Sequence, residues 1–261
     1  MTQKAYAKVN VFLKIVGTRG DYHLLASRFV TLPDLYDTLR FVPKEKPDPH
    51  FILKGKFGCK TEQNSIYKAY RLLSDHTRNK KIEDFFHTHE VIVTKQIPEF
   101  AGLGGGSSDA AAFLRLCNRV LALQIPTETL ASIGAQIGAD VPFFIYGYPS
   151  ANVTGIGEIV TPFEEEVVKL KTFTPPVKCD TAAVYRQFRK NISNQDLTEN
   201  ENLAKTLLHE KSAEILKRYE PETLNDLYPA ALTLYPQLQA YAAPNRFFSG
   251  SGSTFFTTRE D

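Results

Sequence analysis

The chain has 261 residues, of which 43% are hydrophobic and 23% charged; this is an ordinary globular composition and excludes a disordered or collagen-like chain. The 31 basic and 29 acidic residues leave a formal charge of +2, which is too small to indicate a nucleic-acid or membrane partner. Three widely spaced cysteines and the lack of any apolar run approaching ~18 residues favour a cytoplasmic location. No obligate protein partner is evident.

The predicted elements mix strands and helices without regular alternation. Residues 5–16 alternate between apolar and polar side chains, which predicts a strand with one buried face. Further strands are predicted at 27–32, 39–42, 51–53, 90–94 and 253–258. Helices are predicted at 65–74, 107–123, 127–137, 202–209, 213–218 and 230–240. The polar segment 190–202 lacks periodicity and is predicted to be a surface loop. This order favours an α+β protein of two lobes, with a boundary near residue 147 that divides the chain into 1–147 and 148–261.

A glycine-serine segment lies between a predicted strand and a predicted helix. It consists of Pro98, Glu99, Phe100, Ala101, Gly102, Leu103, Gly104, Gly105, Gly106, Ser107 and Ser108. Glycines permit positive φ angles and leave the backbone bare, so that amide N–H groups can converge on an anion at the helix start. The alternative is a flexible turn with a capped helix, but four glycines and two serines favour polyphosphate binding. No Walker A, dinucleotide or protein-kinase motif accompanies the segment.

Three segments together resemble the motifs of the GHMP small-molecule kinase superfamily, which includes galactokinases, homoserine kinases and mevalonate kinases. They are 7–13, the loop 98–108 and the glycine turn 248–254. Further segments at 22–23, 138–144, 155–158 and 225–227 resemble the branch that phosphorylates the 2-hydroxyl of 4-diphosphocytidyl-2-C-methyl-D-erythritol with ATP. The resemblance implies an N-terminal ribosomal-protein-like α/β lobe and a C-terminal ferredoxin-like lobe, with the active site between them. It also implies that the turn 248–254 braces an ATP-binding loop.

The resemblance assigns catalytic roles to Lys8 and Asp140. By itself, a strand lysine is usually a solvated residue, and an aspartate after a Gly-Ala turn is at least equally well explained as a helix N-cap or turn residue. The resemblance makes Asp140 the general base and implies that Lys8 lies a few ångströms from it and stabilises its charge. Because Lys8 and Asn10 are two residues apart on a strand, we expect both to face one pocket.

Aromatic residues carry the predicted substrate specificity. In the resembled branch, a Tyr-His pair and a second aromatic ring recognise the cytosine, and these correspond to Tyr22, His23 and Tyr185, with Asn10 as a further substrate-binding residue. Without the resemblance, the tyrosines would be ordinary half-buried residues. The alternatives are a kinase of another small alcohol, of the homoserine or mevalonate type, or a catalytically silent nucleotide-binding regulator.

Asp109 departs from the asparagine that is usual in the branch. A carboxylate here would repel bound phosphates unless it points away from them. A Mg²⁺ ion is implied as cofactor because ATP phosphates must be neutralised for transfer. No dedicated metal ligands are recognisable, and the Ser108 hydroxyl is the best candidate. His87 and His89 lack a third ligand, which favours a solvated strand end.

Overall fold

The computed structural model describes residues 1–78 and 80–258, and the chain forms two compact units. Unit 1 contains the described residues of Met1–Ala7, Pro33–Ile97 and Gly105–Gly147; unit 2 contains Lys8–Leu32, Pro98–Gly104 and the described residues from Tyr148 onward. The units interleave in sequence because the long strands β1 (Thr2–Arg19) and β2 (Tyr22–Pro43) contribute residues to both. This confirms the α+β, two-lobe class, whereas a single domain boundary at residue 147 stays a prediction.

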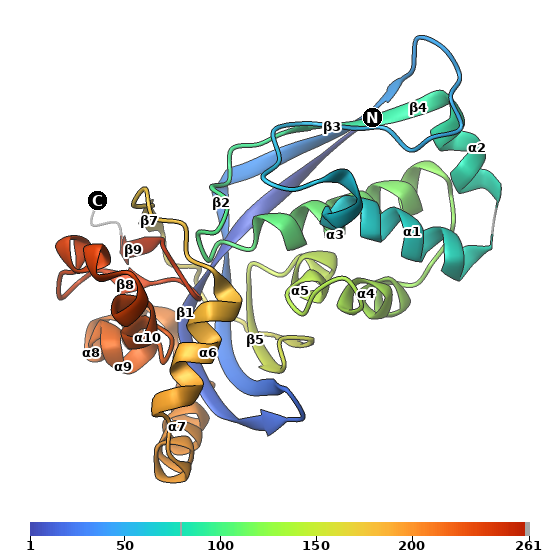
Figure 1. The fold of residues 1–261 in the computed structure, drawn as a ribbon. Coiled ribbons are helices and arrows are strands. Elements are labelled where there is room, and N and C mark those ends of the chain that lie inside the picture. The colour runs from blue at the N-terminus through green and yellow to red at the C-terminus, as the bar shows by residue number, and fades with distance from the viewer. Residues whose placement is uncertain (79, 259–261) are drawn as a thin grey trace. The chain divides into compact units, whose positions relative to one another are not determined.

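Unit 1 combines a small sheet with a group of helices (Figure 1). The sheet pairs β4 antiparallel with residues 38–43 of β2 and parallel with β3. The elements that lie wholly in this unit are β3 (Leu53–Lys54), the 3₁₀ helix η1 (Thr61–Gln63), α1 (Ser65–Thr77), α2 (Lys80–Thr88), β4 (His89–Thr94), α3 (Gly105–Val120), α4 (Thr127–Ala135) and α5 (Val141–Tyr146). Helix α3 packs against both α1 and α5, and an aromatic cluster that includes Phe41, Phe86 and Phe113 fills the core.

Unit 2 contains two sheet regions. In the first, residues 25–30 of β2 pair antiparallel with β5, which pairs with β6. The second has the strand order β7-β9-β8. The elements of this unit are β5 (Ser150–Gly155), β6 (Ile159–Pro162), β7 (Leu170–Phe173), α6 (Thr181–Asn191), α7 (Asn194–Leu207), α8 (Ser212–Arg218), α9 (Pro221–Leu224), α10 (Tyr228–Leu234), the 3₁₀ helix η2 (Pro236–Tyr241), β8 (Phe247–Phe248) and β9 (Phe255–Thr258). Helix α6 packs against α10.

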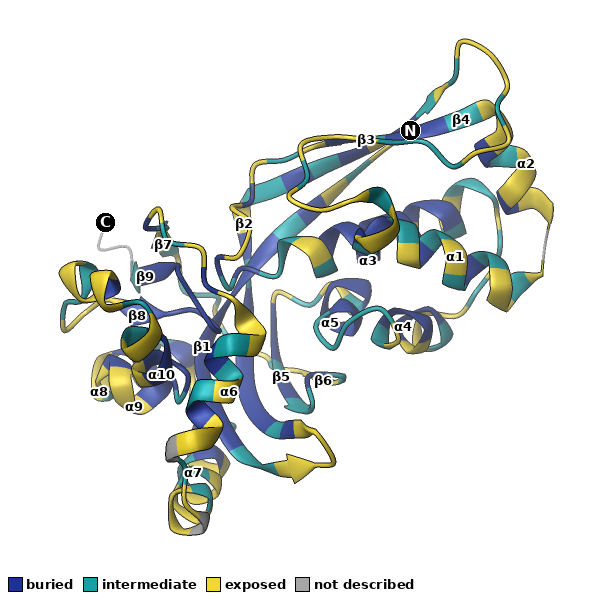
Figure 2. Ribbon diagram, in the orientation of Figure 1, coloured by how far each residue is buried: buried dark blue, intermediate teal, exposed yellow. Residues whose placement is uncertain are grey.

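The prediction that the first strand buries only one face is wrong. Residues 7–15 of β1 are all buried, as the dark blue stretch of β1 in Figure 2 shows. The polar side chains of this stretch have partners inside unit 2: the Lys14 ammonium forms an ion pair with Asp226, and the Asn10 amide donates to the Ser27 hydroxyl at 3.0 Å. A polar face can therefore be buried when each polar group is paired.

The prediction of a surface loop over residues 190–202 is also wrong. Helix α6 continues to residue 191, and α7 begins at residue 194. Ser193 and Asp196 form a capping box, in which the Ser193 side chain accepts from the Asp196 N–H and Asp196 accepts from the Ser193 N–H. The cap satisfies the free backbone donors at the start of α7, which explains how a polar segment forms a helix. None of the helices among the described residues is both long and apolar enough to cross a membrane.

Candidate active site

The glycine-serine loop lies where the sequence predicts, between a strand and a helix. Strand β4 ends at Thr94 and α3 begins at Gly105. Gly102 and Gly104 have φ angles of 73° and 71°, whereas Gly105 and Gly106 belong to the first turn of α3. The glycines thus serve two purposes, since two adopt the left-handed conformation and two form the helix start.

The loop is bound in unit 2 by the glycine turn 248–254. The Ser249 hydroxyl donates to the Gly102 carbonyl at 3.0 Å, and the Thr254 N–H donates to the Ala101 carbonyl at 3.1 Å. A Cβ atom on Gly102 would lie 2.0 Å from the Ser249 carbonyl oxygen, so this approach requires glycine. The bracing of the loop by the third motif is therefore present.

Lys8 contributes to the same arrangement. Its side chain is buried, with Nζ 2.7 Å from the Asn10 Oδ1 and 3.2 Å from the Gly102 carbonyl oxygen, and it lies over the Phe29 ring at 4.4 Å. The prediction that Lys8 and Asn10 share a strand face is confirmed. Because the Lys8 N–H also donates to the Leu103 carbonyl at 3.0 Å, main chain and side chain of one residue both hold the loop.

Asn225 holds the glycine turn through its side-chain amide. Its buried amide nitrogen donates to the carbonyls of Phe248 and Gly250 at 2.8 and 2.9 Å, while its oxygen accepts from the Leu227 N–H at 2.9 Å. The sequence pointed to residues 225–227 only through the resemblance and gave no role for them. The structure shows that Asn225 holds the glycine turn 248–254, and that this glycine turn holds the loop.

Asp140 directly precedes α5 in unit 1 and is half-buried. Its backbone is already helical, with φ −78° and ψ −13°, and its side chain makes no capping hydrogen bond to α5, all of whose residues are described. Asp140 is therefore a turn residue at the start of α5 that does not cap the helix through its side chain. Asp140 belongs to unit 1 and Lys8 to unit 2, so their proximity stays a prediction.

Of the three residues predicted to recognise cytosine, His23 and Tyr185 lie with their rings together. His23, near the start of β2, lies with its ring centroid 5.3 Å from that of Tyr185 and 5.8 Å from that of Phe188, both on α6. The His23 Nε2 is buried and has no hydrogen-bond partner among the described residues. Burial and, to a smaller extent, the charge of Arg189 lower the pKa of His23, which favours the neutral imidazole. Tyr22 is 63% exposed.

The carboxylate of Asp109 is buried and paired within unit 1. Its Oδ2 lies 2.6 Å from the Lys95 Nζ, and Lys95 follows β4 directly. The expectation that this carboxylate points away from bound phosphates stays a prediction, and the structure shows that its partner is Lys95. No signal in the sequence predicts that pairing.

No group of three or more His, Cys, Asp or Glu side chains that could hold a metal ion exists among the described residues. His89 stacks on the Phe85 ring at 4.1 Å, so it has a packing role. Ser108 is buried near the start of α3. A single serine hydroxyl would fit a Mg²⁺ ion held mainly by nucleotide phosphates, because Mg²⁺ usually combines few protein ligands with substrate oxygens and water.

Comparisons with known proteins indicate the class of protein. Residues 64–148, which include the loop and Asp140, match the family model of the GHMP kinases N terminal domain. The glycine turn 248–254 lies outside this match.

Two curated relatives extend the likeness to nearly the whole chain. A 4-diphosphocytidyl-2-C-methyl-D-erythritol kinase of Sulfurimonas denitrificans is 50% identical over 98% of this chain and 96% of its own length. A kinase of the same name from a Sulfurovum species is 48% identical over 98% of both chains. A crystal structure of 4-(cytidine 5'-diphospho)-2C-methyl-D-erythritol kinase superposes with a TM-score of 0.70 at 27% identity, covering 100% of this chain and 90% of that one. The chain belongs to the 4-diphosphocytidyl-2-C-methyl-D-erythritol kinase family.

Proposed function

We propose that the protein transfers the γ-phosphoryl group of ATP to the 2-hydroxyl of 4-diphosphocytidyl-2-C-methyl-D-erythritol, which yields the 2-phosphate and ADP. The reaction is a step in the non-mevalonate route to isoprenoid precursors. The observation that carries the proposal is the 50% identity to a kinase of that name over nearly the whole chain. The braced glycine loop supports it, since a preorganised set of backbone N–H groups suits a triphosphate.

In this reaction the loop 98–108 binds the ATP phosphates. Its carbonyls at 101–103 are already occupied by partners in unit 2, so the backbone is ordered before nucleotide arrives. Preorganisation reduces the entropy lost on binding. The Ser108 hydroxyl is the candidate protein ligand for a Mg²⁺ ion, which would supply neutralisation of the phosphate charge when bound with the nucleotide.

Asp140 accepts the proton of the acceptor hydroxyl, and Lys8 supplies positive charge at the reacting groups. The buried position of Lys8 supports this role, because an ammonium fixed by Asn10 and by the Gly102 carbonyl loses little further freedom when it meets an anion. Catalysis of phosphoryl transfer depends mainly on such placement and charge compensation.

His23, Tyr185 and Tyr22 bind the cytosine ring, and Asn10 lies among the substrate-binding residues. The buried His23 Nε2, without a hydrogen-bond partner among the described residues, supports this assignment because a neutral imidazole nitrogen can bond the edge of an uncharged base. Stacking on an aromatic ring contributes about 1–3 kcal/mol per base. A cytidine-bearing acceptor can bond the His23 Nε2, whereas homoserine and mevalonate carry no base edge to do so.

A coupled assay of ADP release with three acceptors tests the proposal. We expect turnover with 4-diphosphocytidyl-2-C-methyl-D-erythritol and only background with homoserine and mevalonate. Faster turnover with either small alcohol would show that the protein is a kinase with a different acceptor. Nucleotide binding without ADP release from any acceptor would instead favour the silent regulator.

A further inference from the structure

A buried charge cluster in unit 1 is formed by Asp37 on β2, Lys95 after β4 and Asp109 on α3. The Lys95 Nζ lies 2.5 Å from Asp37 Oδ2 and 2.6 Å from Asp109 Oδ2. The side chains are 0%, 12% and 4% exposed for Asp37, Lys95 and Asp109. Charge-assisted hydrogen bonds of this kind are strong and geometrically restrictive.

Asp37 also binds the backbone that leads into the phosphate loop. Its Oδ1 accepts from the N–H groups of Gln96 and Ile97 at 2.5 and 2.9 Å. These are the last two residues before the loop segment 98–104. One carboxylate thus holds the entry backbone with one oxygen and the Lys95 ammonium with the other.

The exit of the loop lies against its entry. A Cβ atom on Gly105, the first residue of α3, would lie 3.0 Å from the Ile97 Cγ2 and 3.7 Å from the Lys95 Nζ. Asp109 is one turn further along α3 and accepts from the same ammonium. Lys95 therefore joins the strand side and the helix side of the loop within unit 1.

We propose that Asp37, Lys95 and Asp109 form a clamp that positions the phosphate loop by fixing its two ends together. The inference rests on the proposed binding of ATP phosphates by this loop. A segment whose ends are fixed has fewer conformations to lose when its amides converge on a ligand. All three are positioning residues, because they act through the backbone of the loop.

The two halves of the clamp are not equivalent. Asp109 Oδ1 is buried and has no hydrogen-bond partner in the part of the chain that the structure describes. The link to α3 is therefore made by the Asp109 Oδ2 alone, which accepts from the Lys95 Nζ. The clamp needs an oxygen acceptor at position 109, and a second carboxylate charge beside Asp37 adds repulsion.

Asp109→Ala and Asp109→Asn form a matched pair that tests this. Alanine removes the link to α3 while Lys95 keeps Asp37, and asparagine retains an oxygen acceptor. Hydrogen exchange of the amides of residues 99–106 is measured without nucleotide, and the affinity for a nonhydrolysable ATP analogue is measured by calorimetry. For the alanine variant we expect about tenfold faster exchange in this segment and about tenfold weaker binding, the effect of losing one charged hydrogen bond. The asparagine variant should stay within about twofold of the wild type in both measurements.

A second comparison covers the case in which Asp109→Ala does not fold. Lys95→Met breaks the clamp, and Lys54→Met is its control, because Lys54 on β3 pairs at 2.7 Å with Glu90 on β4 but is itself 59% exposed. The clamp is refuted if exchange in 99–106 is the same in Lys95→Met and Lys54→Met, or if the alanine and asparagine variants behave alike. A wild type that binds no ATP analogue would overturn the proposed function, while the exchange measurement, made without nucleotide, would still decide the clamp.

Discussion

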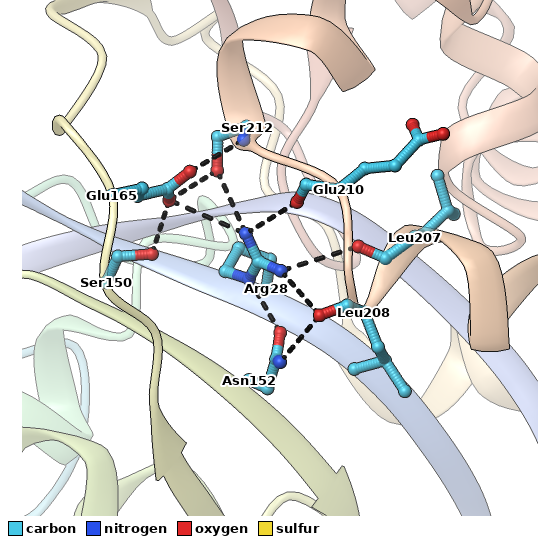
Figure 3. A network of polar contacts seen from close by, with 8 residues as sticks. All are labelled: Arg28, Ser150, Asn152, Glu165, Leu207, Leu208, Glu210 and Ser212. Carbon is cyan, nitrogen blue, oxygen red and sulfur yellow. Dashed lines mark hydrogen bonds and ion pairs between the residues drawn. The ribbon is translucent and has the colours of Figure 1, made fainter.

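Glu165→Gln removes one charge from an ion pair of unit 2 whose two side chains are buried. Arg28 on β2 is 0% exposed and faces the Glu165 carboxylate, with Nη1 3.5 Å from Oε1 (Figure 3). Glu165 also accepts hydrogen bonds from the Ser150 hydroxyl and from the Ser212 hydroxyl and N–H, each at 2.6 Å. Arg28 donates to the Asn152 Oδ1 at 2.6 Å and to backbone carbonyls at the end of α7. The network therefore joins β2 and β5 to the segment between α7 and α8.

The expected loss in the free energy of unfolding follows from the desolvation of the Arg28 guanidinium. Burial lowers the pKa of Arg28 to about 10 and Glu165 acts in the opposite direction, so the guanidinium is charged at neutral pH and needs its counter-ion. Removal of one partner of a buried pair costs about 3–5 kcal/mol, because the remaining charge is left uncompensated. We expect Glu165→Gln and Arg28→Met each to lower the free energy of unfolding by about 3 kcal/mol or more. The double variant should be less destabilised than the sum of the two by about 2–3 kcal/mol.

Urea unfolding followed by circular dichroism and by tyrosine fluorescence measures these values. The control is Lys205→Gln, since Lys205 pairs with Glu201 at 2.9 Å on α7 while both side chains are exposed. This pair is closer than Arg28 and Glu165, yet its loss should cost less than about 0.5 kcal/mol because water replaces the partner. A cost below about 1 kcal/mol for Glu165→Gln, or strict additivity in the double variant, would refute the desolvation argument.

Asp140→Asn should keep ATP-analogue affinity and lower kcat by about 10²–10⁴, the usual contribution of a general base; a near-normal kcat would remove the base from the mechanism. Tyr22→Ala should raise KM for the cytidine-bearing acceptor by about 5- to 150-fold, from the loss of stacking, while KM for ATP changes little; equal changes would place Tyr22 elsewhere. Gly102→Ala should weaken binding of the ATP analogue at least about tenfold, because its Cβ would clash with the Ser249 carbonyl and φ is 73°; unchanged calorimetry would contradict the close approach. Because the pKa of Asp109 is raised to about 7, the folded protein retains a proton that the unfolded chain has released above about pH 4, and this contribution to stability declines as the pH rises toward 7. The unfolding free energy of Asp109→Asn relative to wild type should thus increase by up to about 1.4 kcal/mol per pH unit between about pH 5 and 7, and a pH-independent difference would argue against the shift.

Local sequence was sufficient for the elements whose signals lie within a few residues. The loop between β4 and α3 could be located because glycines, serines and an alanine-rich helix follow one another directly. Lys8 and Asn10 could be placed on one face because strand periodicity alone determines it. Helix α7 could have been found by its capping box, since Ser193 and Asp196 have the required spacing, but the polar composition of the segment favoured a loop.

Burial of polar groups could not be predicted, because it depends on partners far away in sequence. Lys14 is buried on β1 only because Asp226, 212 residues later, pairs with it. Arg28 on β2 likewise depends on Glu165 and on carbonyls at the end of α7. A strand has the same alternating pattern whether its polar face is exposed to solvent or buried with every polar group paired. The pattern therefore predicts the strand but not whether its polar face is buried.

For Asp109, the sequence predicts the direction of the carboxylate but not its partner. The electrostatics of a phosphate loop predicts from the sequence that this carboxylate points away from the phosphates as a charge at the helix start. The partner could not be named, because Lys95 is 14 residues away across the loop and its second carboxylate, Asp37, is 58 residues from Lys95. The Asp109 carboxylate is unfavourable for phosphate binding by itself, but its ion pair with the buried Lys95 ammonium compensates its charge. The same ammonium joins the two ends of the loop. The departure at position 109 and the positioning of the loop thus have one physical cause, which is why a single pair of substitutions, alanine and asparagine, separates the charge from the link.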